Sequence, residues 1–272
     1  MNSIFGSTES KKALSGADKN SYEKLNVLAY GPDKFLKCSE SIDANILNYI
    51  IQNRTLFEPK LREDRRLKTE SGEGHDPFLM ATKYLKRSRG GKVDVIYRQK
   101  RGVGRFCAVR SLSLQCLTRQ IRQSIAAENY LDIDMVNCHP TILKWICEQN
   151  DIPCPILTRY VDNRDQFFKD NDVSKDVGKI VFLSVMNGGS KAFKELKEPS
   201  KELKDFYNYE IKDIHKRIKK QHLEKFKSHE KKRKEEDCKD YNAKASFMNI
   251  CLCDIENKIL MIMWEFFSKD PK

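Results

Sequence analysis

The sequence contains no long apolar run and no apolar leader. No segment reaches the roughly 18 consecutive apolar residues of a membrane-spanning helix. Met1–Ser21 is rich in Ser, Gly, Asn and Lys and lacks the apolar region of a signal peptide. We therefore expect no membrane contact and an intracellular protein, located in the nucleus, in the cytoplasm or at a site of viral replication.

The sequence also lacks any Cys-x-x-Cys pair, although it has nine cysteines. This spacing predicts neither a disulfide framework nor a zinc ribbon. Two fragments of a metal site are present, Cys138-His139 and Cys251-Leu252-Cys253. Small buried residues of a reducing compartment are the more common role of such cysteines, and we favour that interpretation.

Acidic residues are outnumbered by basic ones. The 272 residues include 51 Lys and Arg against 39 Asp and Glu, for a net charge of +12. An excess of this size favours a polyanionic partner, either nucleic acid or an anionic membrane surface. The length allows one large domain or two small ones, and the sequence shows no internal repeat.

The periodicities predict an α+β fold that is mostly helical, with a small antiparallel sheet. Strands are expected near 92–97, 105–109 and 130–134, and helical spacing covers 112–128 and 141–186. The expected regions are a flexible leader (1–21), a helical N-terminal region (22–90), strands (91–140), helices (141–190), a charged helical insertion (191–240) and a buried helix (241–272).

The most informative segment is Tyr130–Leu143. Its first half alternates apolar and acidic residues, so that Asp132 and Asp134 would share one face of a strand. The break at His139-Pro140 follows. Carboxylates at the end of a strand commonly hold Mg²⁺, which fills its other positions with water and substrate phosphates. Asp132 and Asp134 are therefore the predicted metal ligands, and Mg²⁺ is the predicted cofactor.

Three segments follow in order: Ser111–Arg122, the stretch that carries Asp134, and Lys175–Gly188. Together they resemble a palm-domain DNA polymerase of the family A type, as found in transposons and large DNA viruses and related to single-subunit phage RNA polymerases. Motif A would begin at Asp134, with His139 five residues later. Motif B would be Lys175-x3-Lys179-x7-Asn187-Gly188, and Ser111–Arg122 resembles the element before motif A. Asp134-x-x-Asn137-Cys138-His139-Pro140 is also similar to motif A of family B.

The resemblance implies a truncated polymerase-like core with palm strands in 91–140, fingers in 141–190 and a return to the palm in 241–272. It implies a nucleotidyltransferase that uses a DNA primer–template and dNTPs and is joined to, or recruits, a replicative helicase. Asp134 and Lys179 would be catalytic. The nucleotide would contact Asn137, His139, Lys175, Asn187 and Gly188, and the nucleic acid would contact Gln115, Arg119 and Arg122.

A complete palm also needs the carboxylates of motif C, which the sequence lacks after Gly189. Either the chain ends before that motif, or Asp132, Asp254 or Glu256 supplies the second metal ligand. Two further hypotheses stay open: a non-catalytic nucleic-acid-binding replication accessory or inactivated polymerase remnant, and an interaction protein that docks through its basic segment 191–240. A cysteine hydrolase built on Cys138 lacks an identifiable acidic or amide partner downstream.

Overall fold

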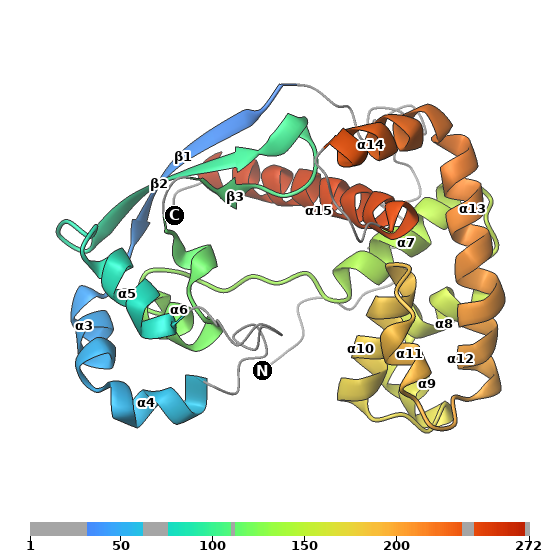
Figure 1. The fold of residues 1–272 in the computed structure, drawn as a ribbon, viewed down its shortest axis with the longest axis horizontal. Coiled ribbons are helices and arrows are strands. Elements are labelled where there is room, and N and C mark those ends of the chain that lie inside the picture. Colours follow the sequence, from blue (N-terminus) through green and yellow to red (C-terminus); the bar gives the residue numbers. More distant parts are fainter. Residues whose placement is uncertain (1–31, 62–75, 110–111, 236–241, 270–272) are drawn as a thin grey trace. The chain divides into compact units, whose positions relative to one another are not determined.

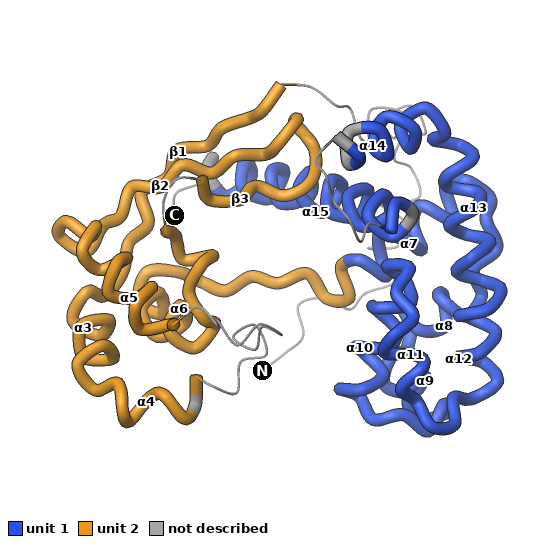
Figure 2. The backbone as a smooth tube through the Cα atoms, viewed as in Figure 1, with its two compact units in different colours: residues 1–29, 139–272 blue, residues 30–138 orange. Residues whose placement is uncertain are grey.

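The computed structural model describes residues 32–61, 76–109, 112–235 and 242–269. Its described residues fall into two compact units, one within 30–138 and one within 139–272, which are considered separately (Figure 2). The predicted leader at 1–21 lies outside the described residues. No helix in these ranges has both the length and the apolarity to span a membrane.

The 30–138 unit contains a three-stranded antiparallel sheet in the order β1-β2-β3 (Figure 1). The strands are β1 (Lys34–Ser41), β2 (Lys92–Gln99) and β3 (Cys107–Ala108). In β2, Val93 and Val95 are buried while their neighbours Lys92 and Asp94 are exposed. This alternation gives the sheet one face toward the core and one toward solvent.

The α-helices described in this unit are α3 (Ala44–Gln52), α4 (Arg54–Leu61), α5 (Pro77–Leu85) and α6 (Arg119–Ala126). Asp43 caps α3 by accepting from the backbone N–H of Ile46 at 2.8 Å. Asp76 caps α5, where Pro77 occupies the first helical position. The core joins side chains from all four of these helices and β2, among them Leu47, Ile50, Leu61, Phe78, Ala81, Tyr84, Val93, Val95, Ile121 and Ile125.

In the described residues of the 139–272 unit, all regular secondary structure is helical. Its main elements are α7 (Cys138–Gln149), α8 (Pro155–Asp162), α9 (Arg164–Asp170), α10 (Lys175–Met186), α11 (Lys191–Lys194), α12 (Lys201–Asp205), the π-helical turn η4 (Phe206–Glu210), α13 (Ile211–Gln221), α14 (Leu223–Glu235) and α15 (Ala243–Lys269). An aromatic cluster forms much of its core, composed of Tyr160, Phe167, Phe168, Phe182 and Phe206.

The predicted class, a mostly helical α+β fold with a small antiparallel sheet, is confirmed. The predicted strand at 130–134 is wrong, because Tyr130–Met135 has no regular secondary structure. Leu131 is 89% exposed and Ile133 55% exposed, so the alternating apolar side chains of this segment are not packed in the core. Alternating residues form a strand only where a neighbouring strand pairs with their backbone. The palm-type sheet therefore lacks the strand on which its metal site depended.

The charged segment 191–240 is helical over its described part, as expected, but it is more than a solvated surface. Leu203, Phe206, Ile211, Ile214 and Ile218 are buried. In α13 the three isoleucines recur every three or four residues, which puts them on one face of the helix. The charged residues of this segment therefore cover a helix that belongs to the core.

Candidate nucleic-acid interface

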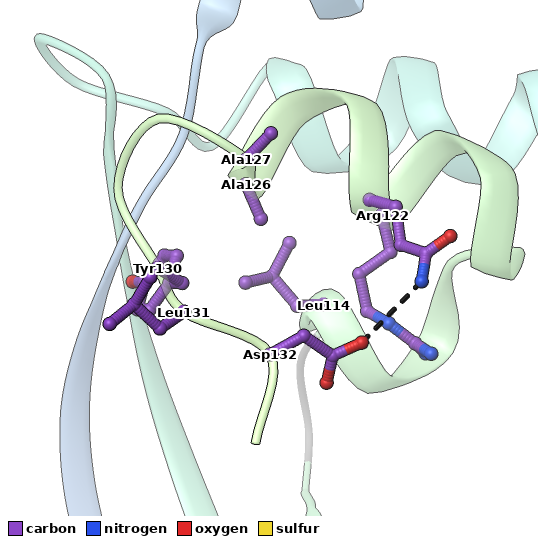
Figure 3. A pocket seen from close by; sticks show the side chains of 8 residues that line it. Leu114, Arg122, Ala126, Ala127, Tyr130, Leu131 and Asp132 are labelled. Atoms are coloured by element: carbon purple, nitrogen blue, oxygen red, sulfur yellow. Dashed lines mark hydrogen bonds between the residues drawn. The ribbon is translucent and has the colours of Figure 1, made fainter. Parts of the chain in front are cut away.

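A pocket of about 450 Å³ opens in the 30–138 unit beside α6 (Figure 3). It lies between α6, the 3₁₀ turn η3 (Leu114–Cys116) and the segment that follows α6. Leucine and alanine side chains supply apolar walls, and an arginine, a glutamine and an aspartate supply polar groups. The lining residues are Leu114, Arg122, Gln123, Ala126, Ala127, Tyr130, Leu131 and Asp132. A mostly apolar cavity with a few convergent polar groups is the usual form of a ligand site.

The amphipathic pattern of α6 determines which of its residues face the core and which line the pocket. Ile121 and Ile125 are buried in the core, so residues three and four positions apart on the other side of the helix face outward. Arg122 and Ala126 each follow a buried isoleucine, are half-buried and line the pocket. Arg119 is exposed one turn before Arg122.

Two hydrogen bonds attach the pocket walls to β1. The backbone N–H of Ser41 donates to the Tyr130 hydroxyl at 2.7 Å. The backbone N–H of Leu114 donates to the Glu40 carboxylate at 3.0 Å. Both wall segments therefore take their position from the sheet, and the pocket is held by the fold of this unit.

Glu40 is the centre of a buried hydrogen-bond network. It is only 6% exposed, and its carboxylate also accepts from the hydroxyls of Tyr84, at 2.6 Å, and Tyr97. Burial, followed by the hydrogen bond to Glu40, raises the pKa of each tyrosine above its ordinary value. Three donors from different elements thus compensate one buried carboxylate, as a buried charge requires.

We expect the 30–138 unit to lose stability as the pH rises above about 10. Unfolded tyrosine titrates near pH 10, whereas folding raises the pKa of Tyr84 and Tyr97. The unfolded state therefore releases its protons first, so this contribution to stability is complete below pH 10 and decreases above it. Urea unfolding followed by circular dichroism should show the decrease, with a shallower slope in Tyr84→Phe. Equal slopes in the two proteins would contradict the assignment.

Within the pocket, the Gln123 side-chain amide donates to the Asp132 carboxylate at 3.5 Å (Figure 3). Arg122 has no ion-pair partner among the residues that the structure describes. The structure thus brings together two predicted site residues, Arg122 and Asp132. Asp134 is exposed beyond them. Mg²⁺ binding by Asp132 and Asp134 stays a prediction.

Gln115 was predicted to contact nucleic acid, but its side-chain amide is hydrogen-bonded within the chain. Its amide nitrogen donates to the carbonyl of Phe106 at 3.1 Å, and its amide oxygen accepts from the backbone N–H of Ala108 at 3.3 Å. Both ends of the amide are therefore engaged by the chain around β3. Arg119, also predicted to contact nucleic acid, is exposed, and both contacts stay predictions.

The residues assigned to motif B lie on α10 and at its C-terminal end. Lys175 forms an ion pair with Asp165 at 3.1 Å, and Lys179 is exposed one turn later. Asn187 donates to the carbonyl of Leu183 at 2.9 Å, and Gly188 follows with a φ of 78°. The last two residues therefore end the helix, with glycine in the left-handed conformation that it adopts readily.

Asn137 and His139, two residues predicted to contact the nucleotide, lie at the start of α7. Asn137 has a φ of 50° in the turn before the helix. His139 lies against α15, where its Nε2 atom is 3.2 Å from a carboxylate oxygen of Glu256. The contacts with Cys253 and with Glu256 raise the pKa of His139 to about 9. Asp254 forms an ion pair with Lys258 at 3.0 Å. Glu256 and Asp254, both considered above as a second metal ligand, are therefore engaged by His139 and Lys258.

The comparisons with known proteins point to a different class from the polymerases. The chain is 31% identical over 177 residues to "Putative helicase V13" of Sputnik virophage, and the alignment spans 61% of this chain and 22% of that protein. The chain thus covers only a minor share of the relative's length. No family model matches the chain, and no solved structure matches it.

The interpretation as a family A-like DNA polymerase, complete or truncated, is therefore wrong. The detected similarity is to a protein described as a helicase, and no polymerase family matches. The structure agrees with this correction, because the segment assigned to motif A forms no strand. Lys-x3-Lys on a helix and Asn-Gly at its end are common features of helices, and their spacing alone was too weak a signal.

Proposed function

We propose that this chain is a nucleic-acid-binding part of a helicase-related viral replication protein. The similarity to the virophage helicase supports the class, and the net charge of +12 supports a polyanionic partner. The 272 residues contain no G-x-x-x-x-G-K-[ST] sequence, the phosphate-binding loop of many ATPases. The role proposed for this chain is accordingly contact with DNA.

The pocket beside α6 is the observation that carries the proposal. Its apolar walls match the face of a nucleobase, while Asp132 and Gln123 offer hydrogen-bond partners for a base edge. Arg122 can then contact the adjoining phosphate or stack on the base. The exposed guanidinium of Arg119 extends the basic surface by one helical turn.

A base enters such a pocket only after it leaves its stack in the duplex. Unstacking costs a few kcal/mol per step in double-stranded DNA, whereas bases of a single strand are already accessible. Single-stranded DNA is therefore the proposed partner. A preference for single-stranded DNA suits a protein related to a helicase, since strand separation produces single-stranded DNA.

The outer face of α13 supplies a second basic surface, in the 139–272 unit. Lys212, Lys216 and Lys220 recur every four residues and are exposed, opposite the buried isoleucines of the same helix. Contacts of this kind add affinity without sequence preference, through release of counterions from the phosphates. They would add to the affinity of the whole chain for DNA.

We expect Arg122→Ala to weaken binding of a single-stranded oligonucleotide about tenfold, because one charge-assisted hydrogen bond is worth roughly 1.5–3 kcal/mol. Fluorescence anisotropy over a range of salt concentrations measures this effect. The slope of log K against log salt should become shallower by about 0.7. Duplex DNA of the same sequence should bind more weakly than the single strand.

Lys37→Ala is the matched control for this measurement. It removes one positive charge from the exposed side of β1, away from the pocket. Its affinity should fall less than that of Arg122→Ala, whose side chain lines the pocket. Equal losses in the two variants would show that only the total charge matters, and would overturn the pocket as the binding site.

A further inference from the structure

The fold brings together two sequence fragments that are more than a hundred residues apart. His139 lies in the first turn of α7, and Cys253 and Glu256 lie one turn apart on α15. Residues three apart on a helix face the same direction, so the thiol and the carboxylate both point toward the imidazole. The three potential ligand atoms lie within 4.8 Å of one another. All three residues belong to the 139–272 unit.

We propose that His139, Cys253 and Glu256 form a three-ligand zinc site that joins α7 to α15. The site is separate from the pocket beside α6 and stands independently of the proposed function. In the part of the chain that the structure describes, this is the one cluster of three or more His, Cys, Asp or Glu side chains with such spacing.

The distances agree with zinc coordination. Zinc bonds are about 2.0–2.1 Å to nitrogen, 2.0–2.2 Å to oxygen and 2.3 Å to sulfur. At a tetrahedral angle these lengths separate nitrogen from oxygen by about 3.4 Å and sulfur from nitrogen by about 3.6 Å. The observed separations are 3.2 Å between His139 Nε2 and Glu256 Oε2, and 4.0 Å between Cys253 Sγ and His139 Nε2. Shifts of a few tenths of an ångström would complete the site.

The direction of the contacts argues against a catalytic triad. In a nucleophile–histidine–acid triad, the nucleophile and the acid engage opposite nitrogens of the imidazole. Here the thiol and the carboxylate both approach Nε2 of His139. Two ligand groups that converge on the same side of a third leave a common point for an ion between them.

The ligand set also selects the kind of ion. Sulfur and imidazole nitrogen favour zinc and similar transition metals, whereas magnesium and calcium prefer oxygen ligands. Cys253 is 8% exposed, and the side chains of His139 and Glu256 are each 14% exposed. Three protein ligands leave the fourth tetrahedral position for water or another group, and the residual exposure gives solvent access to it.

Cobalt titration of the metal-free full-length chain tests the proposal. Tetrahedral Co²⁺ bound to a thiolate gives visible absorption and a sulfur-to-metal charge-transfer band. We expect saturation at one ion per chain, displacement by zinc, and a higher Tm for the zinc-bound chain. Cys253→Ser should remove the charge-transfer band. Glu256→Gln should weaken binding by more than about 100-fold, the upper range of effects from residues outside the ligand shell.

Cys116→Ser is the control, because Cys116 is an exposed thiol outside the cluster. It should retain the band and the zinc-dependent increase in Tm. A folded wild-type chain that binds no cobalt would overturn the proposal. Retention of the band in Cys253→Ser would overturn it as well, since the sulfur ligand would then be another cysteine. Circular dichroism of each variant establishes that it is folded, and Glu256→Gln keeps nearly the same side-chain shape if Cys253→Ser does not fold.

Discussion

Phe182→Ala is expected to destabilise the 139–272 unit by about 3–5 kcal/mol, the usual cost of truncating a fully buried phenylalanine. Phe182 is 1% exposed. Its ring stacks on Tyr160 with centroids 3.6 Å apart and on Phe206 with centroids 4.3 Å apart. Truncation would leave a cavity between two aromatic rings and remove both stacking contacts, which add about 0.5–1.5 kcal/mol each.

Tryptophan fluorescence during urea unfolding reports specifically on the stability of the 139–272 unit. Both tryptophans of the chain, Trp145 and Trp264, lie in the 139–272 unit. Their transition should move to lower urea concentration with little change in slope. Ile180→Ala is the matched control, since Ile180 is on the same helix but 41% exposed. A shift as large in Ile180→Ala would show that the aromatic cluster is not the source of the stability.

The helices of the 139–272 unit could be predicted because each carries a local signal. Apolar residues at helical spacing fill α10, and Asn187-Gly188 ends it. Asn150–Pro153 and Asn171-Asp172 are rich in residues that interrupt helices, and the structure has turns at these positions. Signals of this kind need no knowledge of distant contacts.

The strands were harder to predict because a segment forms a strand only where another strand pairs with its backbone. β1 was missed, since its sequence KFLKCSES shows little alternation of apolar and polar residues. It is a strand because all eight residues pair with β2, from Lys34 opposite Gln99 to Ser41 opposite Lys92. Tyr130–Asp134 has the better alternation but no pairing partner in the described part of the chain. A pattern indicates which face could be buried, and the partner determines whether a strand forms.

The candidate site was predictable only as separate residues. Arg122 and Asp132 were both expected to bind ligands, but the pocket that joins them depends on hydrogen bonds from β1 to Leu114 and Tyr130. His139 and Cys253 were visible in two separate fragments, and Glu256 was considered only as a second ligand of the polymerase metal. Their meeting requires the packing of α7 near α15. Such long-range contacts leave no local pattern in a sequence.

Glu40→Leu is expected to destabilise the 30–138 unit by about 3–5 kcal/mol, comparable to breaking a buried charged pair. Three donors would lose their acceptor: the hydroxyls of Tyr84 and Tyr97 and the backbone N–H of Leu114. Each hydrogen bond to a charged group contributes about 1.5–3 kcal/mol. A buried donor without an acceptor costs more than an apolar group at the same position.

This unit contains no tryptophan, so its unfolding is measured by circular dichroism while the tryptophan signal serves as an internal reference. Glu40→Leu should shift the first signal and leave the second unchanged. Ser39→Ala, on the exposed side of the same strand, should shift neither. A simultaneous change in both signals would show that the two units unfold together.

The same substitution connects stability to the proposed function. Leu114 lines the pocket and is held by Glu40, so loss of the carboxylate should weaken single-stranded DNA binding even at temperatures where the unit stays folded. Glu40→Gln retains an acceptor oxygen and should weaken binding less than Glu40→Leu. Unchanged affinity in a folded Glu40→Leu chain would mean that the wall formed by Leu114 contributes nothing to binding. The contacts would then come from the basic faces of α6 and α13 alone.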